Sequence, residues 1–223
     1  MEKIAYTLER KRVKNINLRV RMDGSVVVSA SPRVSQERVD EFVQSKADFI
    51  RKARESMGKV RENAPEPLCY ITGEQVCLLG KWYTLQVIEG GRQQVAEQGD
   101  VLTITVKQGA DRAVKDKLFR QFLAQQCLLE SEKIAQQVFA KMAYLGIKMP
   151  TLRVRSMTSR WGSCLPTKGA ITINTKLMER PLGCLYYVML HEFCHLVHPN
   201  HSKDFYNLVA QFMPDWKAWK QLL

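Results

Sequence analysis

Alternating apolar and polar residues dominate the start of the chain, and a helical spacing follows them. The stretch INLRVRMDGSVVVSA alternates on both sides of Asp23-Gly24, a residue pair typical of hairpin turns, which predicts two antiparallel strands. Apolar residues then recur at helical spacing over residues 35–56, which predicts one helix with Ser35 as its N-cap. Residues 58–67 contain a glycine, two prolines and mixed charges, so we expect a linker there.

The pattern beyond this linker predicts short strands, a long helix, two more strands and two final helices. Turns are expected at Gly80-Lys81 and Gly99-Asp100, and a long helix runs from Asp111 to a C-cap at Gly146. The further strands and helices are expected at 151–157, 170–178, 181–198 and 202–213. The chain is thus α+β, with a module at 1–61, a β segment at 62–109 that packs with the core, and a domain at 110–223.

Composition limits the class of protein. The chain has 223 residues, of which 45% are hydrophobic, so it can bury a sizeable core. No stretch approaches the roughly 18 apolar residues of a membrane span, and the amino terminus has no apolar run of signal-peptide length. The six cysteines form no CxxC pair, which favours free thiols in a reducing compartment. We therefore expect a soluble, cytoplasmic protein.

The net charge of +12 is unevenly distributed. Residues 1–61 carry 15 basic and 8 acidic side chains, a net charge of +7, whereas residues 150–223 carry 9 and 4, a net charge of +5. This asymmetry favours an anionic substrate or partner, and weak nucleic-acid binding by the basic module is one expectation. The alternative is a solvated basic surface that keeps the protein soluble.

All four histidines of the chain fall within residues 191–201, in HEFCHLVHPNH. His191 and His195 are four apart on a predicted helix, so both face one side, where an ion fits at the ~2.0–2.1 Å that zinc prefers for nitrogen ligands. Glu192 is turned about 100° from His191 around the helix axis. It would reach a water on the ion rather than the ion itself, which predicts a general base.

A third ligand is expected from His201. Catalytic zinc usually takes three protein ligands and leaves one position open. Pro199 lacks an amide hydrogen and disfavours helical backbone at His198, so the helix should end near Val197 or His198 and the chain should turn back. His201 can then approach the same ion, which predicts one Zn²⁺ per chain. The alternative to metal binding is that histidine is favoured near a helix C-terminus by the helix dipole. This would explain one histidine and not four.

Four segments, one of which contains the four histidines, carry a resemblance to a known family. SRWGSC (159–164), ITIN (171–174), HEFCHLVHPNHSKDF (191–205) and MPDW (213–216) occur in this order. Together they resemble the YgjP-like metallopeptidase family, which is similar in its core to the SprT-like zincins. The resemblance implies a zincin-like metal domain, with a long backing helix, a small sheet and the HExxH helix. It also matches His191, His195 and His201 to the ligands and Glu192 to the base.

Two kinds of substrate, peptide and nucleotide, remain open. A zinc metallopeptidase would use Glu192 to activate water, and residues 171–174 would hold an extended peptide as an edge strand. A metal-dependent phosphoanhydride hydrolase would cleave nucleoside triphosphates, with Arg160 and Arg155 holding the anion. A nucleic-acid-associated protease is the third alternative. The loop around Trp161 is expected to shape the rim of the site.

Overall fold

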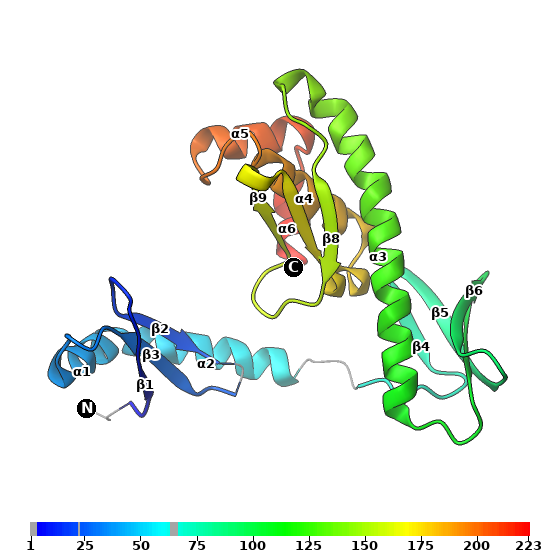
Figure 1. Cartoon of the computed structure of the whole chain (residues 1–223), viewed down its shortest axis with the longest axis horizontal. Helices are drawn as coiled ribbons and strands as arrows, with labels where there is room; N and C mark the ends of the chain where they lie inside the picture. Colours follow the sequence, from blue (N-terminus) through cyan, green and yellow to red (C-terminus); the bar gives the residue numbers. More distant parts are fainter. Residues whose placement is uncertain (1–3, 22, 63–66) are drawn as a thin grey trace. The chain divides into compact units, whose positions relative to one another are not determined.

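The computed structural model describes residues 4–21, 23–62 and 67–223, which form two compact units, Met1–Pro67 and Leu68–Leu223 (Figure 1). Each unit has its own cluster of buried apolar side chains. The first unit therefore contains the basic module predicted at 1–61. The second contains the strands of the predicted β segment together with residues 110–223.

The first unit is a three-stranded sheet covered by two helices. Strands β1 (Thr7–Arg10), β2 (Asn17–Val20) and β3 (Val26–Ala30) lie in the order β1-β3-β2, with β2 and β3 antiparallel and β1 parallel to β3. Between β2 and β3, Gly24 has φ of 81° and the Asp23 carboxylate accepts the Ser25 amide, which confirms the predicted hairpin. The predicted cap is also confirmed, because the Ser35 hydroxyl accepts from the Arg38 amide.

The helical part of this unit differs from the prediction in two ways. Two helices, α1 (Gln36–Ser45) and α2 (Ala47–Glu62), replace the single predicted helix. The break falls at Lys46, a charged residue in the apolar stripe, and Val43 and Ile50 on either side of it are both buried. Since α2 continues to Glu62, the first half of the predicted linker is helical. Residues 63–66 of that linker lie outside the described residues.

The second unit begins with a four-stranded sheet. Strands β4 (Gln75–Leu78), β5 (Lys81–Glu89), β6 (Gln94–Gln98) and β7 (Val101–Val106) lie in the order β4-β5-β7-β6. Leu79 and Gly80 have φ of 52° and 88°, and Gly99 has φ of 62°, so both predicted turns are present. Parallel pairing of β5 with β7 places these hairpins side by side in one sheet.

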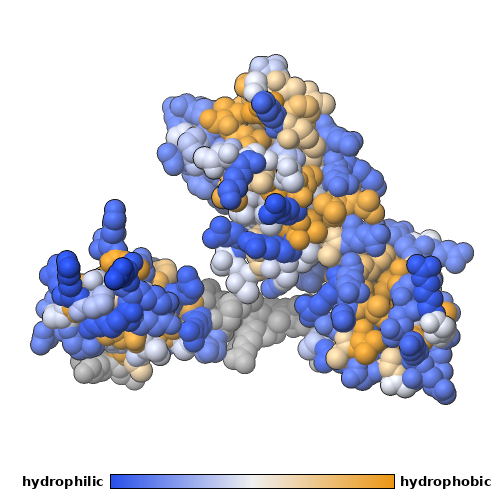
Figure 2. Space-filling model, viewed as in Figure 1, coloured by the Kyte–Doolittle hydropathy of each residue, from blue (hydrophilic) through white to orange (hydrophobic). Residues whose placement is uncertain are grey.

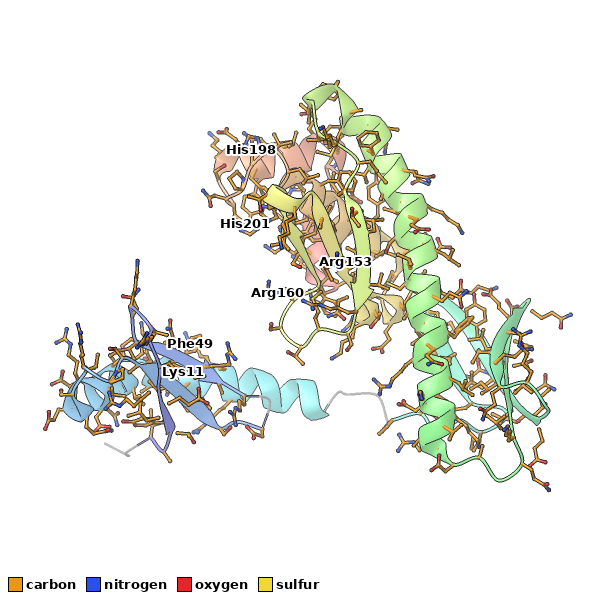
Figure 3. The ribbon with its side chains drawn as sticks, in the orientation of Figure 1. Lys11, Phe49, Arg153, Arg160, His198 and His201 are labelled. Carbon is orange, nitrogen blue, oxygen red and sulfur yellow. The ribbon has the colours of Figure 1, made fainter. Side chains whose placement is uncertain are left out.

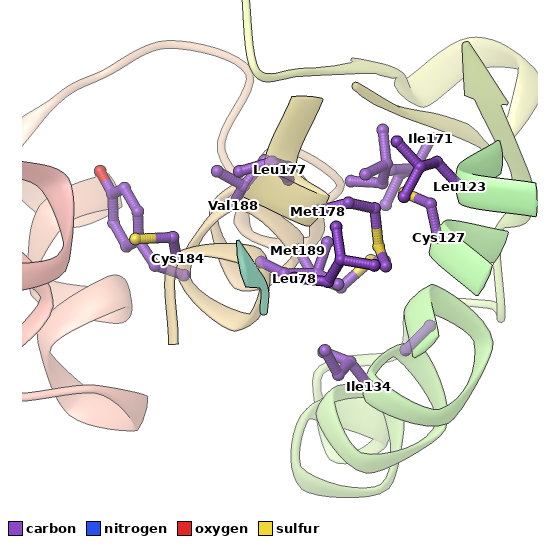
Figure 4. Packing of buried hydrophobic residues seen from close by; sticks show 14 of the residues in the cluster. Leu78, Leu123, Cys127, Ile134, Ile171, Leu177, Met178, Cys184, Val188 and Met189 are labelled. Atoms are coloured by element: carbon purple, nitrogen blue, oxygen red, sulfur yellow. The ribbon is translucent and has the colours of Figure 1, made fainter. Parts of the chain in front are cut away.

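The long helix α3 (Arg112–Met142) connects this sheet to the remaining elements. Asp111 caps it by accepting the Val114 amide, and a 3₁₀ turn, η1 (Ala143–Leu145), ends at Gly146, whose φ is 74°. The predicted start and end of this helix are therefore confirmed. The helix packs on β6 and β7 and also on β8 and α4, so it backs both halves of the unit. Figure 4 shows Leu123, Cys127 and Ile134 of α3 in the shared core.

The third sheet corrects two sequence-based predictions. It contains β8 (Thr151–Arg155), β9 (Gly162–Leu165) and β10 (Ala170–Asn174) in the order β8-β10-β9, with β9 antiparallel to β10. The predicted loop between two strands thus contains a third strand, β9. ITIN, expected at an edge, forms the central strand, because β8 and β9 pair on either side of it. The 3₁₀ turn η2 (Pro166–Lys168) follows β9, and the 3₁₀ turn η3 (Thr175–Glu179) follows β10.

Three helices complete the chain: α4 (Leu182–Cys194), α5 (Lys203–Phe212) and α6 (Trp216–Gln221). Helix α4 packs against both α3 and the third sheet, and α5 and α6 pack against α4. None of the six cysteines, all of which lie within the described residues, forms a disulfide, and three of them, Cys127, Cys184 and Cys194, are buried. Within the described residues, no helix combines the length and apolarity needed to cross a membrane.

A candidate metal centre at the end of helix α4

The turn after α4 brings the histidines together. The helix ends at Cys194, about one turn before the predicted end, and His195 is its C-cap. The amides of Val197 and His198 both bond to the Cys194 carbonyl, which tightens the backbone before Pro199 is reached. The chain then reverses toward α5, and His201 returns to the C-terminal end of α4 (Figure 3 labels His198 and His201).

His191, His195 and His201 each offer a ring nitrogen, and these nitrogens all lie within 4.8 Å of one another. The Nε2 atoms of His191 and His201 are 3.0 Å apart. Two ligands at ~2.0–2.1 Å from a tetrahedral zinc ion would be about 3.3 Å apart, so the spacing fits such an ion. The three histidines supply three nitrogen ligands. A four-coordinate zinc ion held by them would keep one position open for water or substrate, as a catalytic site requires.

The environment of His191 and His195 favours the neutral imidazole that a metal ligand must be. Burial, together with the neighbouring His195 and His201, lowers the pKa of His191 to about 3. Burial also lowers the pKa of His195, against the opposing effect of its bond to the His198 carbonyl. Both rings therefore offer a lone pair at neutral pH rather than a second proton.

The second ring nitrogen orients one of the three candidate ligands, His195. The Nδ1 atom of His195 is 3.1 Å from the backbone oxygen of His198, an acceptor that fixes the proton on Nδ1 and leaves Nε2 free for a metal. His198 thus contributes through its carbonyl rather than its ring. The Nδ1 atom of His191 is buried and has no hydrogen-bond partner among the described residues, so no hydrogen bond at Nδ1 orients that ring.

Phe205 is the packing centre of the cluster, and sequence reasoning gave it no role. Its ring is fully buried, and its centroid lies 4.9, 4.6 and 4.8 Å from those of His191, His195 and His201. Ser202 positions this residue by capping α5, since its hydroxyl accepts the Phe205 amide. One apolar ring therefore restricts the orientation of all three candidate ligands.

A second set of aromatic rings surrounds this centre. Tyr206 stacks on His201 and on Trp216, and Trp216 stacks on Tyr187, which meets His191 edge-on. Lys220 lies 5.6 Å above the Trp216 ring, and its charge contributes to the lowered pKa of His191. Trp216 belongs to the MPDW segment, so this motif forms part of the wall beside the histidines.

Glu192 is buried between α4 and the edge strand β9, with only 5% of its surface exposed. A Cβ atom at Gly162 would lie 2.5 Å from its Oε1 atom, so the strand backbone passes directly over the carboxylate. Burial raises the pKa of Glu192 to about 7, while the charge of Arg160 and a backbone hydrogen bond from Cys164 oppose this rise. A carboxylate with such a pKa can both accept and donate a proton near neutrality.

Asn174, at the end of β10, fixes the loop that carries Arg160. Its side-chain amide donates to the carbonyls of Met157 and Arg160 at 2.9 and 2.8 Å, and its oxygen accepts the Met157 amide. Its backbone amide donates to the Trp161 carbonyl. Trp161 packs against the core, and the Arg180 guanidinium lies over its ring. The last residue of ITIN therefore positions the loop rather than binding along an edge.

Comparison with known proteins identifies the family of this chain. The chain belongs to the YgjP-like metallopeptidase family, because the family model for the YgjP-like metallopeptidase domain matches residues 14–223. It is accordingly a metal-dependent hydrolase of the metallopeptidase class. A search of curated proteins found no match.

Two solved structures show local similarity to this chain. One is the metallopeptidase zymogen abylysin of Pyrococcus abyssi, 19% identical with a TM-score of 0.38, covering 41% of this chain and 89% of that chain. The other is the metallopeptidase zymogen jannalysin of Methanocaldococcus jannaschii, 15% identical with a TM-score of 0.37, covering 41% of this chain and 85% of that chain.

Proposed function

We propose that the protein is a zinc-dependent peptidase with a zincin-like catalytic domain, in which His191, His195 and His201 hold one zinc ion and Glu192 is the general base. The observation that carries this proposal is the convergence of three imidazoles at the end of α4, beside a buried carboxylate. When bound, zinc supplies Lewis acidity, which polarises the scissile carbonyl and lowers the pKa of water.

Glu192 moves the protons in this scheme. Its carboxylate takes a proton from the attacking water and later delivers that proton to the leaving nitrogen. The pKa of about 7 suits both transfers, since the carboxylate is neither too weak a base nor too weak an acid near neutrality. Gly162 leaves the space that the carboxylate occupies, and Arg160 and the Cys164 amide stabilise its charged form.

Strand β9 supplies a surface for an extended substrate. It pairs with β10 along one side and is one of the two edge strands of this sheet. An edge strand presents unpaired backbone donors and acceptors, so a peptide can bind by adding as a further strand. Since Gly162 of β9 contacts Glu192, a peptide on this edge would pass the catalytic carboxylate. Residues 171–174, the edge first expected, are already paired on both sides.

The experiment is a parallel substrate test with the zinc-loaded full chain. A peptide library and the four nucleoside triphosphates are incubated separately, and products are identified by mass spectrometry. We expect cleaved peptide bonds with the wild type and none with Glu192→Gln, while the nucleotides stay intact. Nucleotide hydrolysis without peptide cleavage would overturn the peptidase proposal in favour of the phosphoanhydride alternative.

A further inference from the structure

A groove lies beside the end of strand β9 and the turn that follows helix α4. It has a volume of about 770 Å³, within the range of ~300–1,000 Å³ typical of ligand pockets. Pro166 and Lys168 of η2 line one side, Leu196 and Val197 of the turn after α4 line another, and the segment joining α3 to β8 supplies the rest. All of these elements belong to the second unit.

Two residues that line the groove follow directly in the chain after elements of the proposed catalytic site. Leu196 directly follows the ligand His195, and Pro166 directly follows Leu165, the last residue of β9. The other end of this strand, Gly162, contacts Glu192. Three residues of extended chain span about 10 Å. A peptide that pairs with β9 and presents its scissile bond beside Glu192 therefore reaches the groove about three residues away.

The direction of the peptide follows from strand pairing. Antiparallel ladders are slightly more stable per residue than parallel ones. A peptide antiparallel to β9 places its amino-terminal part at the carboxyl end of that strand, where Pro166 begins the groove. The groove therefore receives residues on the amino-terminal side of the scissile bond.

The lining of the groove is cationic over an apolar floor. Lys148 and Lys168 are its charged residues, and no acidic side chain lines it. Within the part of the chain that the structure describes, neither lysine forms a side-chain hydrogen bond or an ion pair, as Lys133 does with Glu130. The floor includes Ile147, Leu196 and Val197. Such a lining complements a side chain with an aliphatic stem and a carboxylate.

We infer that this groove is a specificity subsite for an acidic residue about three positions before the scissile bond. The inference rests on the proposed peptidase function, and it names the class of peptide that the site selects. Lys148 and Lys168 are specificity-determining residues that take no part in proton transfer. Reversing their charges should therefore change which peptide binds and leave the metal site as it is.

Binding is the first test, because it does not require turnover. Zinc-loaded full-length protein carrying Glu192→Gln is titrated with fluorescent peptides that differ only by Glu, Gln or Lys at each of the positions two to four before a fixed central bond. We expect the best Glu peptide to bind about three- to tenfold more tightly than its Lys counterpart. Adding Lys148→Glu and Lys168→Glu should invert this order.

A matched charge reversal controls for net charge. Lys107→Glu with Lys117→Glu changes two exposed lysines that do not line the groove, and it should leave the preference for Glu unchanged. Circular dichroism and zinc content should be the same for both double variants. Equal binding of the Glu and Lys peptides, or the same loss of preference in both double variants, would overturn the inference.

A cleavage assay then distinguishes failure of the proposed subsite from failure of the peptidase proposal on which it rests. If the wild type cuts library peptides with no preference for acidic residues before the scissile bond, the subsite is wrong and the peptidase proposal stands. If the wild type cuts no peptide, the peptidase proposal fails, and the binding experiment still decides whether the groove selects acidic chains. A preference on the carboxyl side of the bond would contradict the antiparallel placement.

Discussion

Gly162 and Glu192 are in direct contact between strand β9 and helix α4. A Cβ atom at residue 162 would approach the Oε1 atom of Glu192 to 2.5 Å and the Cγ1 atom of Val188 to 2.8 Å. Contacts this short do not occur between relaxed atoms, so a larger residue at 162 must displace the carboxylate or the strand. The position of Glu192, the proposed general base, therefore depends on residue 162 being a glycine, which has no side chain.

Gly162→Ala should lower turnover without removing the metal. The added methyl group displaces the Glu192 carboxylate, and small misplacements of a catalytic group cost up to about 10²-fold in rate. We expect a fall in kcat with zinc content unchanged, as measured by elemental analysis and peptide cleavage. Gly91→Ala is the control, because a Cβ there meets no atom within 4 Å. Full turnover by Gly162→Ala would show that the contact does not position Glu192.

Phe205→Ala should weaken zinc binding although Phe205 touches no metal. Its ring packs against all three histidine rings, so its loss frees them to rotate. Loss of an outer partner typically reduces metal affinity about 10–100-fold. A chelator competition assay measures this affinity. Phe205→Leu, which keeps most of the buried volume, should retain more of it, and equal affinity in all three proteins would contradict a packing role.

Local patterns made much of the fold predictable. The hairpin at Asp23-Gly24 and the cap at Asp111 depend on residues next to one another in the chain, and the structure contains both. The grouping of His191, His195 and His201 was predictable for a related reason, since the helical spacing of the first two and the expectation of a helix end before Pro199 both come from residues close together in the chain. These predictions needed no knowledge of the tertiary structure.

Non-local packing explains what the sequence did not reveal. Residues 162–165 have no alternating apolar pattern, and they form β9 because β10 offers a pairing partner. The central place of β10 likewise depends on β8, which lies earlier in the chain and pairs parallel to it. Phe205 looks like any apolar residue on a helix, so only the fold shows that three imidazoles surround it. Helix α4 ended early because the turn tightened before Pro199.

The basic first unit should bind polyanions weakly through the open face of its sheet. Lys11, Arg19 and Arg21 line a groove of about 480 Å³ on this unit, and Glu9 in the same groove is paired with Lys11. Hydrophilic residues cover most of the visible surface of this unit (Figure 2). Binding to single-stranded DNA, measured by fluorescence anisotropy, should fall steeply as salt rises.

Charge reversal tests this face directly. Arg19→Glu with Arg21→Glu should abolish DNA binding at low salt, because it replaces two cationic groups on this face by anionic groups that phosphates repel. Arg51→Glu, which changes an arginine already paired with Asp48, is the control. If wild type shows no binding at low salt, the alternative holds, and the charge serves as a solvated surface.

The fold should survive removal of the metal. The core of the second unit is built from apolar side chains of α3, α4 and two sheets, and it does not depend on the histidine cluster. Circular dichroism after chelation should keep most of the helical signal, unlike a zinc finger, which unfolds without its ion. Complete unfolding after chelation would make the site structural.

Zinc content and turnover, measured together on Glu192→Gln and His191→Ala, test the role of Glu192 most directly. Glutamine keeps the shape of the side chain but cannot accept the proton of the attacking water. We predict that Glu192→Gln retains one zinc ion per chain and loses about 10²–10⁴-fold in turnover. His191→Ala should lose the metal itself. If Glu192→Gln loses its zinc, Glu192 is a ligand, and if it keeps full turnover, another group activates the water; either result would contradict the proposed mechanism.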